Sequence, residues 1–235
     1  MIRQYEIMAS IPKSSLDFLT KLKKNNHRDW MTENKKEYLA SEKRLKEVYA
    51  QIQQGLSKTD EIEKLKVFRI NRDIRFSNDK TPYNVHRSAS FSRAGAHRRG
   101  GYYLRIEPNG NSMIGGGFFG PEPADLKRIR QEFEMDASEI RAILAEPAFV
   151  KAYGGAFDAW DPVKTAPRGF NVDGPNIDLI RLKNFVVTRK FTDAQVTAPD
   201  FPDTVVAHFQ LLRPFFDYMS DVLTTDLNGV SLLED

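Results

Sequence analysis

The spacing of apolar residues changes along this chain of 235 residues, and that change limits the folds it can adopt. Over the first quarter, apolar residues recur every three or four positions, which is the period of a helix with one buried face. Between Lys66 and Phe119 they recur at every second position, as in a strand with one buried face. Helical spacing returns further along the chain. This pattern predicts an α+β fold.

The N-terminal quarter is expected to contain two main helices. The first covers residues 15–24, and a further turn carrying Trp30 follows, with Asp29 placed to cap it. The second is longer and contains apolar residues from Leu45 to Leu56 at helical intervals, and Gly55 and Ser57 mark its approximate end.

The central region is expected to form an antiparallel sheet. A turn at residues 107–111 should join strands 101–107 and 112–119 into a hairpin, and residues 182–191 are a further candidate strand. Residues 154–175 are rich in Gly and Pro and are expected to form a long ordered loop.

Further helices are expected after this hairpin and near the C-terminus. One begins after Pro121 and Pro123, a second ends at Pro147, and a pair that begins at Asp200 is broken near Pro214. The simplest architecture is a single α+β domain over residues 1–235. A central, mainly antiparallel sheet would be flanked by N-terminal and C-terminal helices.

Several classes of protein are excluded by composition. The chain has no cysteine, which excludes disulfides, thiolate metal sites and cysteine nucleophiles. The start of the chain carries Arg3, Glu6 and Lys13 without an apolar stretch of signal-peptide length. No run approaches the roughly 18 apolar residues that a membrane span requires. We therefore expect a cytoplasmic protein with no membrane partner.

Common catalytic motifs are also missing. The four histidines, His27, His86, His97 and His208, show no metal-ligand spacing, so no metal site is expected. The glycines of residues 115–120 formally match a dinucleotide fingerprint, but prolines separate them from the next helix. They are better interpreted as a place where another element lies close to the strand, with a ligand as the alternative. The cofactor stays unassigned.

Residues 68–83, which we name the arginine segment, carry the most informative pattern. Arg69, Arg72 and Arg75 recur at three-residue spacing among Asp73, Asp79 and apolar anchors. In one interpretation the carboxylates fix the arginines and shape the turn at Pro82. In the other, one or more arginines hold a carboxylate or phosphate in bidentate geometry.

Several blocks of the chain occur together in one known family. They are the runs Phe18–Trp30, Asn34–Tyr38, Phe68–Phe76, Asp79–Tyr83, Gly101–Tyr103 with Glu107-Pro108, Gly115–Gly117 and Ala166–Phe170. In these blocks the chain resembles the bacterial and fungal family of domain of unknown function 2461, from about residue 16 to 216. Met31 departs from the pattern, which usually has a second aromatic after Trp30. The resemblance implies a single α+β domain and supplies no established activity.

The leading functional hypothesis is a protein that binds a phosphate- or carboxylate-bearing ligand, with any reaction left unassigned. Its pocket would be built by the arginine segment, the glycine-rich strand and the loop at Pro167–Gly169. The candidate ligand-binding residues are Arg69, Arg72, Asp73, Arg75, Lys80, Tyr103 and Arg168. Asp73 would orient an arginine, and would act as a general base if it were buried without a full partner.

Two alternatives belong to other classes. The basic hairpin over residues 87–105 could bind nucleic acid weakly through phosphate contacts from its arginines, Arg87, Arg93, Arg98, Arg99 and Arg105. Alternatively, the protein has a structural or interaction role, and the polar network only fixes the fold.

Overall fold

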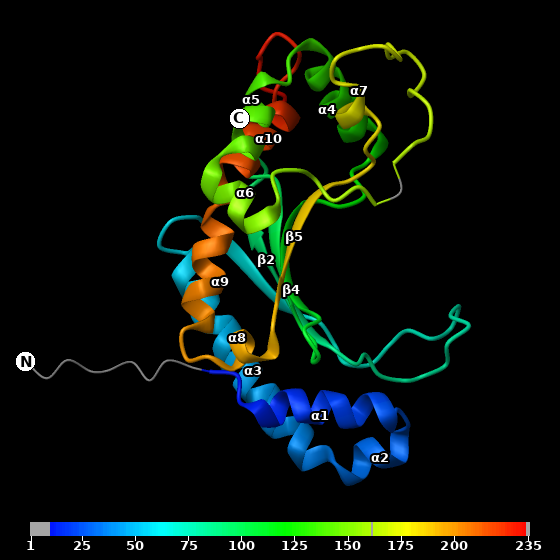
Figure 1. Cartoon of the computed structure of the whole chain (residues 1–235), viewed down its shortest axis with the longest axis vertical. Helices are drawn as coiled ribbons and strands as arrows, with labels where there is room; N and C mark the ends of the chain where they lie inside the picture. Colours follow the sequence, from blue (N-terminus) through cyan, green and yellow to red (C-terminus); the bar gives the residue numbers. More distant parts are fainter. Residues whose placement is uncertain (1–9, 161, 234–235) are drawn as a thin grey trace, which may run out of the picture. The chain divides into compact units, whose positions relative to one another are not determined.

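The computed structural model describes residues 10–160 and 162–233. These residues adopt an α+β fold with a five-stranded antiparallel sheet, which confirms the predicted fold class (Figure 1). Residues 1–9, on which the expected absence of an export signal depends, lie outside the described residues. Over the described ranges, no helix combines the length and apolar character needed to cross a bilayer.

The sheet has the simplest possible strand order, because each strand pairs with the next one in sequence, β1-β2-β3-β4-β5. The strands are β1 Ile62–Val67, β2 Arg87–Arg93, β3 Gly101–Ile106, β4 Ser112–Phe118 and β5 Phe185–Phe191. The hairpin predicted around residues 107–111 is the β3–β4 connection. Asn109 at its tip has a φ of 66°, a left-handed conformation that asparagine tolerates.

The chain divides into two compact units. The first contains residues up to Phe91 together with Tyr103–Ile114 and Lys190–Ala207, and the second contains Ser92–Tyr102, Gly115–Arg189 and the residues from His208 onward. Strands β2 to β5 contribute residues to both.

The first unit is built around a long helix. Its helices are α1 Lys13–Lys24, α2 Arg28–Glu33, α3 Lys35–Leu56, α8 Asp193–Thr197 and most of α9 Phe201–Gln210. The buried side chains of α3 include Leu45, Val48 and Ile52, which share one face because they are three or four residues apart. Helix α3 packs against α1, α2 and β1.

The second unit, over its described residues, places α10 among four other helices. Its helices are α4 Pro123–Met135, α5 Ser138–Ala145, α6 Pro147–Tyr153, α7 Ile177–Ile180 and α10 Arg213–Thr224. Helix α10 packs against α4 and α5, and α4 packs against α7. Phe215 and Phe216 are fully buried and make aromatic contacts with Phe118 of β4.

Some elements differ from the sequence predictions. Strand β1 begins at Ile62, before the alternating region was expected to start, and residues 68–86 lie between strands instead of forming one. The helix expected to end at Pro147 is α5, which ends at Ala145, but Pro147 also occupies the first turn of a further helix, α6, where its missing N–H costs nothing. The cap of α2 is the ring of His27, which accepts a hydrogen bond from the Trp30 amide, and not Asp29.

Candidate functional site

The first unit contains a pocket of about 550 Å³ beside the arginine segment. Its volume is in the range of small-molecule sites. The lining comes from the end of β1, the beginning of the arginine segment, the beginning of β2 and one residue of β3. It consists of Lys66, Val67, Phe68, Arg69, Asn71, Arg72, Asp73, Asn84, His86, Ser88 and Tyr103.

The arginine segment holds its shape because it pairs with itself. The Arg72 amide donates to the Pro82 carbonyl at 2.9 Å, and the Asn84 amide donates to the Ile70 carbonyl at 2.7 Å. Asn71 and Tyr83 form an isolated antiparallel bridge between these bonds. The segment is thus an irregular extension of the β1–β2 pairing, and it projects as a long arm (Figure 1).

Apolar and amide contacts fix the base of this arm to the N-terminal helices. Ile70 is buried in a cluster with Phe18, Leu22 and Met31. The Asn26 side chain donates to the Tyr83 carbonyl at 2.8 Å and accepts from the Tyr83 amide at 3.1 Å. The pocket lining at this end of the segment therefore has a rigid support.

The Arg72 side chain stabilises the conformation of the arginine segment through hydrogen bonds within it. Its Nη1 donates to Asp79 Oδ2 at 2.5 Å and to the Thr81 carbonyl at 3.0 Å, and Nη2 reaches the Ser77 hydroxyl at 3.4 Å. For Arg72 these contacts support the structural interpretation of the sequence, since both terminal nitrogens already bind groups of the segment.

Asp73 lines the pocket but is not the buried carboxylate that a general base would require. It lies in solvent and pairs with Arg75, whose Nη2 is 2.7 Å from Asp73 Oδ2. The hydrogen bonds from Arg75 hold the pKa of Asp73 below its ordinary value. The condition for a general base at Asp73, burial without a full partner, is therefore not met, whereas a role in orienting an arginine agrees with this contact.

Two cationic side chains of the pocket lining have no carboxylate partner among the described residues. Across the described ranges, neither Lys66 nor Arg69 forms an ion pair. The Lys66 ammonium instead lies over the Phe68 ring, 5.0 Å from its centroid. Both side chains are exposed and hydrated, so they need no anion for stability and remain available to bind one.

His86 is the titratable imidazole of the pocket lining. Burial lowers its pKa, the neighbouring Arg105 and Arg87 lower it further, and Glu107 acts in the opposite direction. From the sequence, His86 was expected to have no metal-binding role, and it was not among the candidate ligand-binding residues. The signal that could have found it is the alternation Asn84, His86, Ser88, which places all three on one face of an extended chain.

Tyr103 connects the pocket to the interior of the first unit. Its ring meets Phe68 edge to face, with centroids 6.2 Å apart. Deeper inside, Arg87 of β2 is held by Glu42 of α3 through two hydrogen bonds, of 2.5 and 2.9 Å. Of the predicted site residues, the pocket brings together Arg69, Arg72, Asp73 and Tyr103.

The remaining predicted residues do not line the pocket. Lys80 donates to the Ile74 carbonyl at 3.0 Å, and Arg75 lies in solvent beside Asp73. Arg168 belongs to the second unit, where its side chain is exposed. The glycine-rich strand is also packed by protein: a Cβ on Gly116 would lie 2.5 Å from Leu212 Cδ1.

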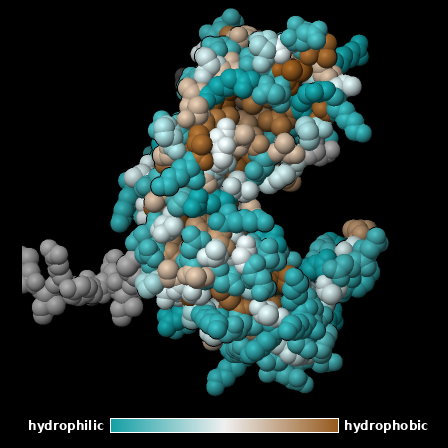
Figure 2. Space-filling view, in the orientation of Figure 1, coloured by the Kyte–Doolittle hydropathy of each residue, from teal (hydrophilic) through white to brown (hydrophobic). Residues whose placement is uncertain are grey.

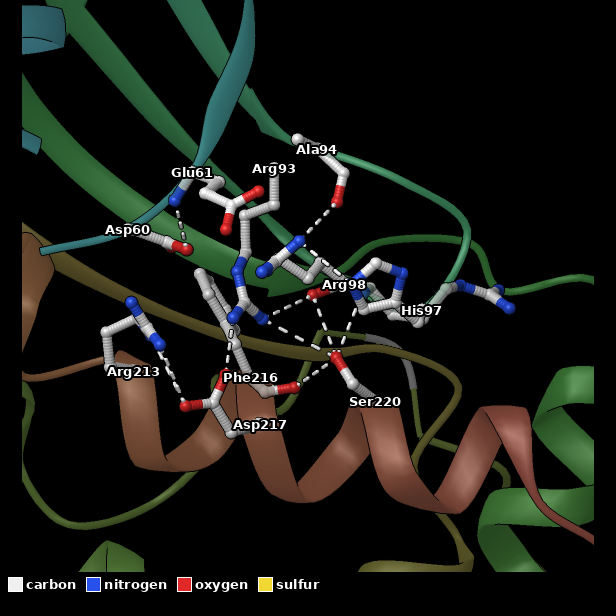
Figure 3. Close-up of polar contacts among 11 residues, drawn as sticks. Asp60, Glu61, Arg93, Ala94, His97, Arg98, Arg213, Phe216, Asp217 and Ser220 are labelled. Atoms are coloured by element: carbon white, nitrogen blue, oxygen red, sulfur yellow. Dashed lines mark hydrogen bonds and ion pairs between the residues drawn. The ribbon is translucent and has the colours of Figure 1, made fainter. Parts of the chain in front are cut away.

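The arginines of the 87–105 hairpin mostly make internal contacts. Arg87 pairs with Glu42, Arg99 with Asp125 and Arg105 with Glu107. Arg93 is buried, pairs with Asp217 of α10 and donates to the Arg99 carbonyl at 3.1 Å (Figure 3). Because carboxylates occupy these guanidinium groups, the geometry does not favour this hairpin as a phosphate-binding surface.

No cluster of three or more metal-ligating side chains occurs among residues 10–160 and 162–233.

Searches of curated proteins and of solved structures gave no match. Residues 14–218, which include the pocket lining and most of both units, match a family model described as "Conserved hypothetical protein (DUF2461)". The chain therefore belongs to the DUF2461 family.

Proposed function

We propose that the protein binds a small anionic ligand, bearing a phosphate or carboxylate group, in the pocket beside the arginine segment. The observation that carries this proposal is the pair Lys66 and Arg69, two cations that line one pocket and have no carboxylate partner among the described residues. A guanidinium can hold such an anion with two parallel hydrogen bonds, and an ammonium adds a point charge.

Neutral groups of the same lining supply further hydrogen bonds. Asn71, Asn84, Ser88 and Tyr103 carry amide or hydroxyl donors. Asp73 is the one carboxylate of the lining, and Arg75 neutralises it. The local balance is therefore positive, as a site for an anion requires.

Replacement of Arg69 by Gln tests the proposal. We expect sulfate or phosphate to bind the wild-type protein in a calorimetric titration, and Arg69→Gln to weaken binding about tenfold or more, because a charge-assisted hydrogen bond is lost. Arg28→Gln is the matched control, since Arg28 is exposed on α2 of the same unit and lies outside the lining. Equal affinities for wild type and Arg69→Gln would remove the basis of the proposal.

The pH dependence of sulfate binding gives a second test. The pKa of His86 is lowered, so the ring is neutral at pH 7 and takes up its proton below the ordinary histidine range. We expect sulfate affinity to rise as the pH falls through this range, since a further cation then faces the pocket. Sulfate suits the titration because its own charge does not change there. His86→Asn should remove the rise, and a rise retained in this variant would assign it to other groups.

A further inference from the structure

Phe76 is the most exposed large apolar side chain of the described residues, with 96% of its surface accessible. It lies in the arginine segment, in the stretch between Arg72 and Asp79 that Arg72 closes with its hydrogen bonds. Figure 2 shows an apolar spot at the end of this otherwise hydrophilic arm. An aromatic ring that an ordered segment holds in water can stack on another planar group.

A short series of contacts connects this ring to the pocket. The Arg75 guanidinium carbon lies 5.9 Å from the centroid of the Phe76 ring. The same guanidinium pairs with Asp73, which lines the pocket. The ring and the anion-binding groups therefore belong to one ordered structure, separated by a single residue pair.

We propose that Phe76 is a stacking platform for a base of a single-stranded nucleic acid whose backbone phosphate occupies the pocket beside Arg69. This inference rests on the proposed function, because it identifies the bound anion as a phosphodiester. A cationic groove combined with an aromatic ring is the arrangement by which proteins hold single strands without reading their sequence.

The charges around Phe76 favour a single strand over a lipid surface. Asp73 and Asp79 lie on either side of the ring in sequence, and each is paired with an arginine, so the end of the arm carries little net charge. An anionic bilayer would gain little from such a surface. The bases of a duplex are already stacked on one another, whereas those of a single strand are free to stack on Phe76.

The experiment measures the affinity of a fluorescein-labelled oligothymidylate of about ten nucleotides by fluorescence anisotropy. We expect Phe76→Ala to weaken binding about tenfold and Phe76→Trp to retain it, because any aromatic face can stack on a base. Phe119→Ala is the control, since Phe119 is another exposed phenylalanine and lies in the second unit. Folding of Phe76→Ala is checked by its melting temperature.

An abasic oligonucleotide of equal length separates stacking from charge. Phe76→Ala should bind it as the wild type does, because no base is present. If Phe76→Ala binds oligothymidylate with wild-type affinity, or if the wild type binds anionic phosphatidylserine vesicles and not the oligonucleotide, the inference is overturned. Sulfate binding that still depends on Arg69 would then leave the proposed function in place.

Discussion

Replacing Glu42 by Gln is expected to lower the free energy of unfolding by about 3 kcal/mol or more. Glu42 is the partner of Arg87, and their side chains retain only 12% and 4% of their exposed surface. The neutral amide would leave a guanidinium charge inside the first unit without compensation, and desolvated charges are costly. Urea denaturation monitored by circular dichroism measures the free energy of unfolding of the variant and the wild type.

Glu47→Gln is the matched control on the same helix. Glu47 pairs with Arg44, but these side chains retain 35% and 59% of their exposed surface. The same substitution there should change the stability by less than about 0.5 kcal/mol. Equal losses of unfolding free energy for the two variants would show that burial does not determine how much the Glu42–Arg87 ion pair contributes to stability.

Gly117→Ala is expected to destabilise the protein by about 3 kcal/mol or more. Gly117 lies in β4 with a φ of 138°, and an added Cβ would overlap the carbonyl oxygen of Phe185 and lie 2.8 Å from Val186 Cα. Both atoms belong to the backbone of β5, so the clash cannot be relieved by rotation of a side chain. The pairing of β4 with β5 would have to open locally.

Gly110→Ala separates this clash from the loss of glycine's conformational freedom. Gly110 also has a positive φ, of 70°, but an added Cβ there meets no atom within 4 Å. Its replacement should cost about 1 kcal/mol, which is the penalty of the left-handed conformation alone. Thermal unfolding of the two variants gives the comparison, and similar melting temperatures would mean that β5 shifts to accept the methyl group.

The secondary structure was largely predictable because it depends on local spacing. The alternation of Tyr102, Leu104 and Ile106 identified β3, and the intervals in α3 identified the long helix. Strand β1 was missed because Glu63, Lys64 and Lys66, all exposed, interrupt the apolar alternation on which detection depends. The missed helix α6 begins at a proline, which ends a helix in some contexts and begins one in others.

The site was only partly predictable, because its decisive contacts join residues far apart in sequence. The density of charge singled out the arginine segment, but it could not show which arginines had partners. Arg72 and Asp79 are seven residues apart, and the turn that brings them together is an irregular one. Arg87 and Glu42 are 45 residues apart, so no local pattern could show that this arginine is occupied.

The consecutive order of the strands has a consequence for how the pocket can vary. The arginine segment joins β1 to β2, which are already neighbours, so the pairing of the sheet does not require a connection of this length. Extra residues in such a connection add little to the entropy cost of closing it. The residues beyond the Asn71–Tyr83 bridge could thus be exchanged or shortened with the strand pairing kept, which makes the arm a place where new specificity can be grafted.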